Sequence, residues 1–257
     1  MNGSIGRCII DISSTQLTPV DYPLLTHPSV AGILLFQANY QDPEQLQTLC
    51  QSIHNENPEL LIFVDQEGGQ IQRFKTGFTP LPSLYSLGQL YEQHPDEALL
   101  KATQTGLIMA TELKKVGVDC SFAPVLDLHD PHSPIIGQKE RALHSDPNIV
   151  ISLAQAMIKG MHQANMVAIG KHFPGHGTVQ EDSHTHSSIC TQTFTQLKAS
   201  MRPFIALHHQ LAGIMTAHIT YPAVDANHIV CHSPQWHHYL RAKLNYQGAI
   251  ISDCLSM

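Results

Sequence analysis

The feature of this sequence that most constrains its fold is the alternation of short apolar segments with longer helical ones. Seven segments have the length and the apolar, β-branched composition of buried strands, and they cover residues 8–12, 31–36, 60–64, 119–123, 166–170, 212–216 and 248–252. The helical patterns between them cover residues 43–55, 95–116, 147–164, 195–209 and 234–244, and we expect Pro203 to kink or divide the fourth of these. This alternation predicts parallel βα units, arranged either as a doubly wound sheet or as a barrel.

Polar side chains follow five of the predicted strands. They are Asp65, Asp127, Lys171 with His172, His218, and Asp253. Barrel enzymes take their functional residues from the carboxyl ends of several strands, whereas an open sheet concentrates them at one switch point. No GxGxxG or Walker pattern is present. We therefore predict an α/β fold of the (β/α)8 TIM-barrel type. Because seven strands are counted where such a barrel has eight, we expect the last strand and the final helices to be missing.

Composition limits the class of protein further. A chain of 257 residues with 42% hydrophobic residues can form one α/β domain, which we expect to span residues 1–257. The net charge of −7 and the lack of a basic block argue against a nucleic-acid partner. We find no signal-peptide pattern, no membrane-spanning apolar run and no CxxC pair among the six scattered cysteines. These features predict a soluble, cytoplasmic protein with reduced thiols.

The densest group of ionisable residues follows the fifth predicted strand. Residues 171–177 read KHFPGHG and residues 181–184 read EDSH. Proline and glycine exclude regular helix or strand there, so we expect a shaped loop at the carboxyl end of a strand. A histidine-rich surface loop that binds metal by chance is the alternative. The spacing of His172, His176, His184 and His186 matches no strong zinc signature, which makes metal the weaker interpretation.

This segment closely resembles the signature of glycoside hydrolase family 3, and in particular its bacterial β-N-acetylhexosaminidases. Further resemblance is found at residues 32–36, 64–74, 122–127, 215–218 and 250–257, and so extends across nearly the whole chain. The resemblance implies a barrel fold and the release of terminal β-linked N-acetylglucosamine with retention of configuration. For cytoplasmic bacterial members it implies a muropeptide substrate and a role in peptidoglycan recycling. It implies no metal and no organic cofactor.

The resemblance also implies three catalytic residues. Asp253 lies at the end of a buried strand and matches the nucleophile of the family, although an aspartate there could simply cap a following helix. Many relatives have a second acid beside the nucleophile, where this chain has Cys254. Asp182 and His184 are two residues apart, so their side chains fall on the same side of an extended loop. The resemblance implies that they form the acid/base dyad, in which the carboxylate orients the imidazole.

Five residues are expected to bind the substrate. Asp65 and Arg73 belong to a segment that resembles the DxEGGxxxR pattern of the family, and a carboxylate there can accept hydrogen bonds from two sugar hydroxyls. Arg141 resembles a binding arginine after the fourth strand, although Ala142 and Leu143 replace the usual Ser-Phe. Lys171 and His172 offer donors to sugar hydroxyls. For each, a surface ion pair or a helix cap is the structural alternative.

Three other functions remain open from the sequence. They are a phosphorolytic N-acetylglucosaminidase of the same family, a sugar-binding protein that has lost catalysis, and a metal-dependent hydrolase that uses the histidine-rich loop. The strand count adds an expectation about the protein itself. A barrel without its last strand leaves two strand edges and apolar surface uncovered, so we expect poor stability and little activity from residues 1–257 alone.

Overall fold

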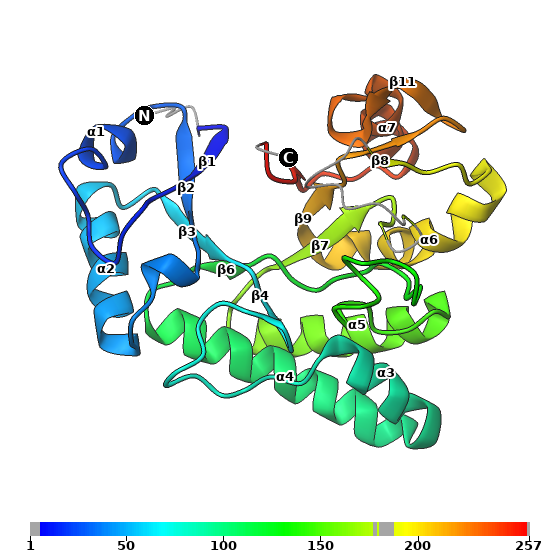
Figure 1. The fold of residues 1–257 in the computed structure, drawn as a ribbon, viewed down its shortest axis with the longest axis horizontal. Helices are drawn as coiled ribbons and strands as arrows, with labels where there is room; N and C mark the ends of the chain where they lie inside the picture. Colours follow the sequence, from blue (N-terminus) through cyan, green and yellow to red (C-terminus); the bar gives the residue numbers. More distant parts are fainter. Residues whose placement is uncertain (1–5, 177–178, 180–187, 256–257) are drawn as a thin grey trace.

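Seven parallel strands form the centre of the computed structural model, which describes residues 6–176, 179 and 188–255. One sheet contains β1 (Cys8–Asp11), β2 (Val30–Leu35), β3 (Leu61–Val64) and β6 (Cys120–Ser121), and another contains β7 (Ala168–Phe173), β9 (Leu211–Thr216) and β12 (Ala249–Ser252). A parallel bridge between Val125 and Lys171 joins the two sheets. The order along the joined sheet is therefore β1-β2-β3-β6-β7-β9-β12 (Figure 1).

This order distinguishes the two fold classes. Each parallel strand pairs with the next parallel strand of the chain, and the order never reverses as it does in a doubly wound sheet. The barrel-type arrangement predicted from the sequence is thus observed, with the seven strands that were counted. β1 and β12 stand at the two ends of the order, and the described residues record no pairing between them.

Two smaller sheets accompany the parallel strands, one antiparallel and one mixed. After β3 the chain forms a hairpin of β4 (Gln66–Gly68) and β5 (Ile71–Gln72), and a small sheet combines β8 (Ser188–Ile189), β10 (Ile219–Tyr221) and β11 (Asp225–Ile229). The tip of the hairpin requires glycine. Gly68 has a φ of 111°, and a Cβ there would lie 2.4 Å from the carbonyl oxygen of Pro82.

The helices follow the strands as predicted, with two additions. The longer ones are α2 (Pro43–Glu56), α4 (Pro95–Lys115), α5 (Pro147–Gln163) and α6 (Phe194–Leu207), and α7 (Pro234–His238) continues into a π-helical turn at Tyr239–Lys243. The helices α1 (Tyr22–Leu25) and α3 (Leu84–Gln93) were not predicted, and single 3₁₀ turns occur at Gln37–Asn39, His208–Gln210 and Val230–His232. Pro203 does not divide α6, which continues past it as one helix.

Side-chain caps explain where several helices begin. Asp42 accepts a hydrogen bond from the backbone N–H of Gln45 at the start of α2, and Asp146 accepts one from Asn148 at the start of α5. Both helices have proline at the first turn, where no N–H is needed. α6 begins with a reciprocal pair, in which Thr193 and Gln196 each bind the other's backbone N–H.

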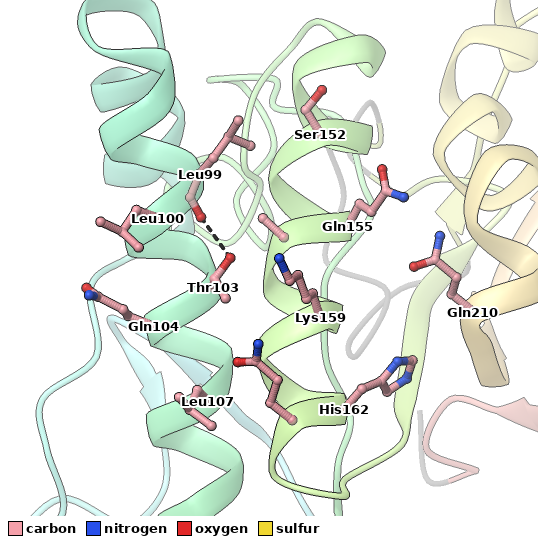
Figure 2. A pocket seen from close by; sticks show the side chains of 12 residues that line it. Leu99, Leu100, Thr103, Gln104, Leu107, Ser152, Gln155, Lys159, His162 and Gln210 are labelled. Atoms are coloured by element: carbon pink, nitrogen blue, oxygen red, sulfur yellow. Dashed lines mark hydrogen bonds between the residues drawn. The ribbon is translucent and has the colours of Figure 1, made fainter.

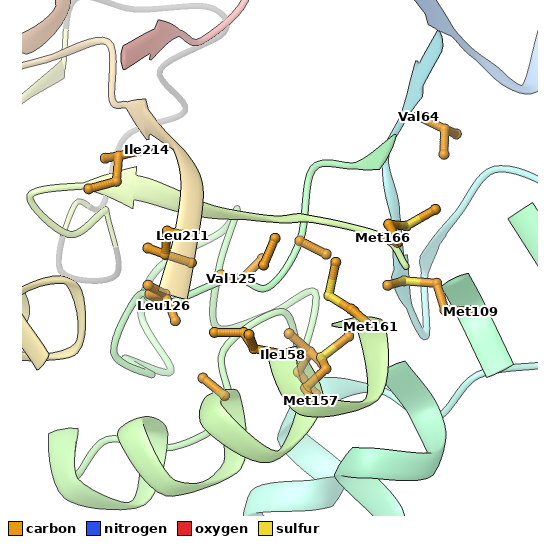
Figure 3. Close-up of a cluster of buried hydrophobic side chains, with 14 of the residues drawn as sticks. Val64, Met109, Val125, Leu126, Met157, Ile158, Met161, Met166, Leu211 and Ile214 are labelled. Carbon is orange, nitrogen blue, oxygen red and sulfur yellow. The ribbon is translucent and has the colours of Figure 1, made fainter. Parts of the chain in front are cut away.

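The main core lies between the parallel strands and the helices packed around them, including α2, α4, α5 and α6. Figure 3 shows side chains of this cluster, among them Met109, Met157 and Met161 from the helices and Val125 and Ile214 from the strand side. The helices α4 and α5 approach closely because each has a glycine where it meets the backbone of the other, Gly106 in α4 and Gly160 in α5. A Cβ on Gly160 would lie 2.0 Å from the carbonyl oxygen of Thr103, and one on Gly106 would lie 2.1 Å from that of Met157.

A second cluster occupies the opposite face of the strands. The rings of Phe63 and Phe122 stack at 5.1 Å, and Ile169 and Met215 belong to the same cluster. Successive residues of a strand point to opposite faces, which is why Ile214 joins the main core and Met215 the second one. Among the helices that the structure describes, none is both long and apolar enough to cross a membrane.

Candidate active site

Four elements bring ionisable side chains to the carboxyl ends of the strands. Asp65 follows β3, Lys171 and His172 lie in the second half of β7, and Asp253 follows β12. The segment after β6 contributes Asp127 and, further along, Arg141. All five predicted substrate-binding residues and Asp253 belong to the described part of the chain. The peptide between Lys171 and His172 is cis, as are those before Pro124 and Pro174.

Lys171 and Glu67 form the buried centre of the site. The Lys171 Nζ lies 2.6 Å from Asp65 Oδ1 and 2.6 Å from Glu67 Oε1, and both Lys171 and Glu67 are 1% exposed. Arg141 binds Glu67 with two parallel hydrogen bonds of 2.8 and 2.7 Å, the geometry in which a guanidinium binds a carboxylate most strongly. Two cations and two carboxylates therefore neutralise one another below the surface.

The charged groups of this network shift one another's pKa values toward the ionised form. Burial alone would raise the pKa of the Glu67 carboxyl, but Arg141 and Lys171 outweigh it and hold that pKa well below its usual range. Burial would lower the pKa of the Lys171 ammonium, yet Asp65 and Glu67 raise it above its ordinary value. The pKa of Arg141 is raised too, because the pull of Glu67 exceeds the effect of burial. All three groups stay charged at neutral pH.

Arg73, which directly follows the β4–β5 hairpin, lies beside the carboxylate of Asp65. One of its terminal nitrogens lies 3.6 Å from Asp65 Oδ2, and its guanidinium stands 6.0 Å from the centre of the Phe36 ring. Its Nε is buried and has no hydrogen-bond partner among the described residues. Arg73 thus supports Asp65, and about a third of its side chain, 32%, remains exposed.

Asp127 and His172 form a second buried pair beside this network. Asp127 is fully buried, and its Oδ2 lies 2.7 Å from the Nδ1 of His172. Its carboxylate also accepts the backbone N–H of His172 at 3.2 Å and that of His176 at 2.6 Å. The other ring nitrogen of His172, Nε2, faces Asp253 Oδ2 at 4.0 Å. The imidazole therefore stands between two carboxylates that come from different strand ends.

Asp253 is the more accessible of these two carboxylates. Its side chain is 18% exposed, its backbone N–H donates to the carbonyl oxygen of Thr216 at 3.1 Å, and its Oδ1 accepts the N–H of Cys254 at 2.8 Å. Burial would raise the pKa of the Asp253 carboxyl, but the neighbouring His172, together with the Cys254 N–H and Lys171, lowers it. Asp253 is therefore an ionised, partly exposed carboxylate that can act as a nucleophile.

Asp182 and His184 lie outside the described residues, so the predicted dyad stays a prediction. The chain leading toward them begins beside His172. His176 is buried, and burial together with His172 lowers the pKa of its imidazole to about 4. The hydroxyl of Tyr221, which is also buried, donates to the carbonyl oxygen of Gly175 at 2.8 Å and ties this segment to β10.

Sequence reasoning missed two members of the site. Glu67 stands inside the segment that predicted Asp65 and Arg73, but no role was assigned to it. The sequence predicts Asp127 as a polar residue at a strand end and gives it no role in the site. In both cases the only available signal was a carboxylate just after a buried strand, because their partners are distant in sequence, at separations of 74 residues for Glu67 to Arg141 and 45 for Asp127 to His172.

Two further features lie apart from this cluster. In the described part of the chain, no group of three or more His, Cys, Asp or Glu side chains is arranged to hold a metal ion. A groove of about 1110 Å³ runs along α4 and α5 and is lined by residues such as Leu99, Thr103, Gln155 and Lys159 (Figure 2). None of the predicted site residues lines it.

Fold and site together define the class of protein. Parallel strands in barrel order, with carboxylates, a lysine and a histidine gathered at their carboxyl ends, are the arrangement of a barrel enzyme. The comparisons specify that class. Residues 12–257 match the model of the glycosyl hydrolase family 3 N-terminal domain. The chain therefore belongs to glycosyl hydrolase family 3.

Individual relatives place it in one branch of that family. The chain is 44% identical over 256 residues to a β-hexosaminidase of Nitrosomonas eutropha, covering 98% of this chain and 73% of that protein. It is 44% identical over 257 residues to a β-hexosaminidase of Thiobacillus denitrificans, covering 99% and 71%. The crystal structure of NagZ from Neisseria gonorrhoeae in complex with N-trifluoroacetyl-D-glucosamine has a TM-score of 0.94 and 40% identity, covering 98% of this chain and 75% of that one. The protein is thus a glycoside hydrolase of the β-hexosaminidase type, which confirms the predicted family, fold class and enzyme class.

Proposed function

We propose that this protein is a retaining glycoside hydrolase that releases terminal β-linked N-acetylglucosamine. The observation that carries the proposal is the convergence of Asp253, His172, Lys171 and Asp65 at the carboxyl ends of three strands. Glycoside hydrolysis with retention needs a carboxylate below the anomeric carbon and an acid above the leaving oxygen. The site supplies an ionised, partly exposed carboxylate within a set of hydrogen-bonding groups.

Asp253 is the proposed nucleophile. Its carboxylate oxygen forms a bond to the anomeric carbon while the bond from that carbon to the leaving oxygen breaks, which gives a covalent glycosyl-enzyme. The lowered pKa of Asp253 keeps the carboxylate ionised for this step. In the second step water attacks the anomeric carbon, the carboxylate leaves, and the sugar is released with its original configuration.

His184 and Asp182 are the proposed acid/base pair. The imidazole gives a proton to the leaving oxygen in the first step and accepts one from water in the second. The carboxylate of Asp182 would hold the histidine in one tautomer and stabilise its protonated form. This part of the proposal rests on the match of residues 181–184 to the family signature.

Five residues are proposed to bind the sugar. Asp65 has one oxygen on Lys171 and the other beside Arg73, so its remaining lone pairs can accept hydrogen bonds from two hydroxyls. Lys171 supplies a donor on the same side, and the Nε2 of His172 offers a second polar contact for a hydroxyl. Arg141 is almost fully engaged with Glu67, and we assign it a role in holding Glu67 and Lys171 in place as well as in binding.

The proposed natural substrate is a muropeptide fragment of the cell wall, within peptidoglycan recycling in the cytoplasm. The NagZ of Neisseria gonorrhoeae, with 40% identity, was crystallised with an N-acylated glucosamine, which supports a 2-acetamido sugar as the group recognised. We further propose that residues 1–257 form a single barrel-type domain, since the main core contains residues from near both ends, from Ile12 to Tyr246.

The test is hydrolysis of a fluorogenic N-acetyl-β-glucosaminide, run with and without inorganic phosphate and with and without a chelator. The proposal predicts that the turnover, however slow in residues 1–257 alone, releases the fluorophore and free N-acetylglucosamine in all conditions. Formation of a sugar 1-phosphate when phosphate is present would instead establish phosphorolysis. Loss of turnover with the chelator would contradict the proposed metal-independent mechanism.

A further inference from the structure

The carboxylate of Asp127 is a fully engaged acceptor near the proposed nucleophile. It is fully buried, and it accepts three N–H groups, two from the backbone and one from a side chain. The backbone donors are His172 and His176, and the side-chain contact is the Nδ1 of His172, at 2.7 Å. Because it has no contact with solvent, this carboxylate cannot contact a substrate. It can instead hold the groups that donate to it in fixed positions.

The charge of Asp127 determines which role the Nδ1 of His172 takes in their hydrogen bond. Burial would raise the pKa of the Asp127 carboxyl, but His172 and His176 outweigh it and hold that pKa below its ordinary value. An ionised carboxylate can only accept hydrogen bonds. The Nδ1 of His172 must therefore carry a proton, and Nε2 is left as the ring atom that faces Asp253 Oδ2 at 4.0 Å.

We propose that Asp127 is a positioning residue, which fixes the tautomer and the ring plane of His172 so that Nε2 is presented to the sugar beside Asp253. The proposal rests on the proposed functions of Asp253 and His172. At 4.0 Å the two atoms form no direct hydrogen bond, so a hydroxyl of the substrate can contact both. Asp127 itself touches neither the sugar nor the reacting atoms.

Asp127→Asn is a nearly isosteric test of this role. An amide oxygen in the place of Oδ1 keeps the bonds to the N–H groups of His176 and His172, which lie at 2.6 and 3.2 Å. The amide nitrogen then takes the place of Oδ2 and donates toward Nδ1. Nδ1 must become an acceptor, so the proton moves to Nε2 and the tautomer is reversed while the two backbone contacts to Oδ1 are kept.

The tautomer can be read directly, without any substrate. Long-range proton–nitrogen NMR correlations of the imidazoles distinguish a protonated Nδ1 from an acceptor Nδ1, and His172→Gln identifies the signal by its loss. The proposal predicts a protonated Nδ1 in the unaltered protein and an acceptor Nδ1 in Asp127→Asn. An acceptor Nδ1 in the unaltered protein would overturn it, whether or not any variant folds and whether or not the proposed reaction is correct.

Kinetics separate positioning from a merely structural role. We expect Asp127→Asn and His172→Gln each to reduce kcat/KM by about 10²-fold, the loss typical of a misplaced contact. Because Asp127 acts through His172, the double variant should lose no more than the worse single one. Asp225→Asn is the matched control, since Asp225 is also buried and also contacts a histidine, His228, at 3.2 Å, and it should leave turnover unchanged. Multiplied losses in the double variant, or a loss in the control equal to that in Asp127→Asn, would overturn the proposal.

Discussion

Replacing Glu67 with glutamine removes one negative charge from the buried group of two cations and two carboxylates. The Lys171 Nζ keeps Asp65 as a partner at 2.6 Å, but Arg141 loses the carboxylate that now binds it at 2.8 and 2.7 Å. A glutamine side chain offers one oxygen, and its NH₂ group would face a donor. Arg141 is therefore left in a buried position with an uncompensated positive charge and an unmatched N–H.

The size of the effect follows from this loss. Breaking a buried ion pair by removing one partner destabilises a protein by about 3–5 kcal/mol. For a domain of this size, each kcal/mol changes Tm by about 2–4 °C, so Glu67→Gln should lower Tm by roughly 6–20 °C. Glu92→Gln is the control, because Glu92 is 60% exposed and contacts His144 at 3.1 Å. An exposed pair contributes about 1 kcal/mol or less.

The pH dependence gives the same prediction a second readout. The pKa of Glu67 is lowered in the folded protein, so its contribution to stability is present above the unfolded pKa, about 4.3, and is lost as the pH falls toward the folded value. The difference in unfolding free energy between the two proteins should thus be constant near neutral pH and shrink below about pH 4. Urea unfolding at several pH values measures this difference. A Glu67→Gln protein as stable as the unaltered one at pH 7 would refute the reasoning.

Three other predictions concern catalysis and packing. Asp253→Ala should abolish turnover, because no carboxylate remains to attack the anomeric carbon, and should leave sugar binding measurable by calorimetry; full activity in this variant would sink the assignment. Asp182→Ala or His184→Ala should reduce turnover most for poor leaving groups, which need protonation, and less for an activated phenolic glycoside; equal losses on both substrates would indicate binding or folding roles. Gly160→Ala should destabilise the protein by about 1–3 kcal/mol in urea unfolding, since its Cβ would lie 2.0 Å from the carbonyl oxygen of Thr103, and an unchanged midpoint would show that α4 and α5 can separate without cost.

Much of the fold could be predicted because strand and helix patterns are local. The apolar runs around Ile33, Ile62 and Ile214 predicted three strands that are observed as β2, β3 and β9. The polar residues that follow five of the seven predicted strands then predicted at which end of the sheet the site would form. The expected division of the helix at Pro203 is wrong: α6 continues past this buried proline, because tertiary packing overrides local propensity.

Site residues could be predicted only where they stand in a recognisable sequence segment. Asp65, Lys171 and His172 stand in distinctive segments, and the structure brings them together. Glu67 and Asp127 are ordinary carboxylates in sequence, and their importance comes from burial beside partners that only the fold supplies. A local sequence pattern does not reveal pairing between residues that are far apart in the chain. The roles of these two carboxylates are therefore visible only from the three-dimensional contacts.

The most direct test of the central claim is to trap the glycosyl-enzyme. A fluorinated N-acetylglucosaminide with a good leaving group forms the covalent intermediate but slows its hydrolysis, and mass spectrometry of digested protein then locates the attached sugar. We predict one sugar per chain, attached to the peptide that contains Asp253. Attachment to another residue, or turnover that gives the inverted sugar with no covalent adduct, would contradict the account.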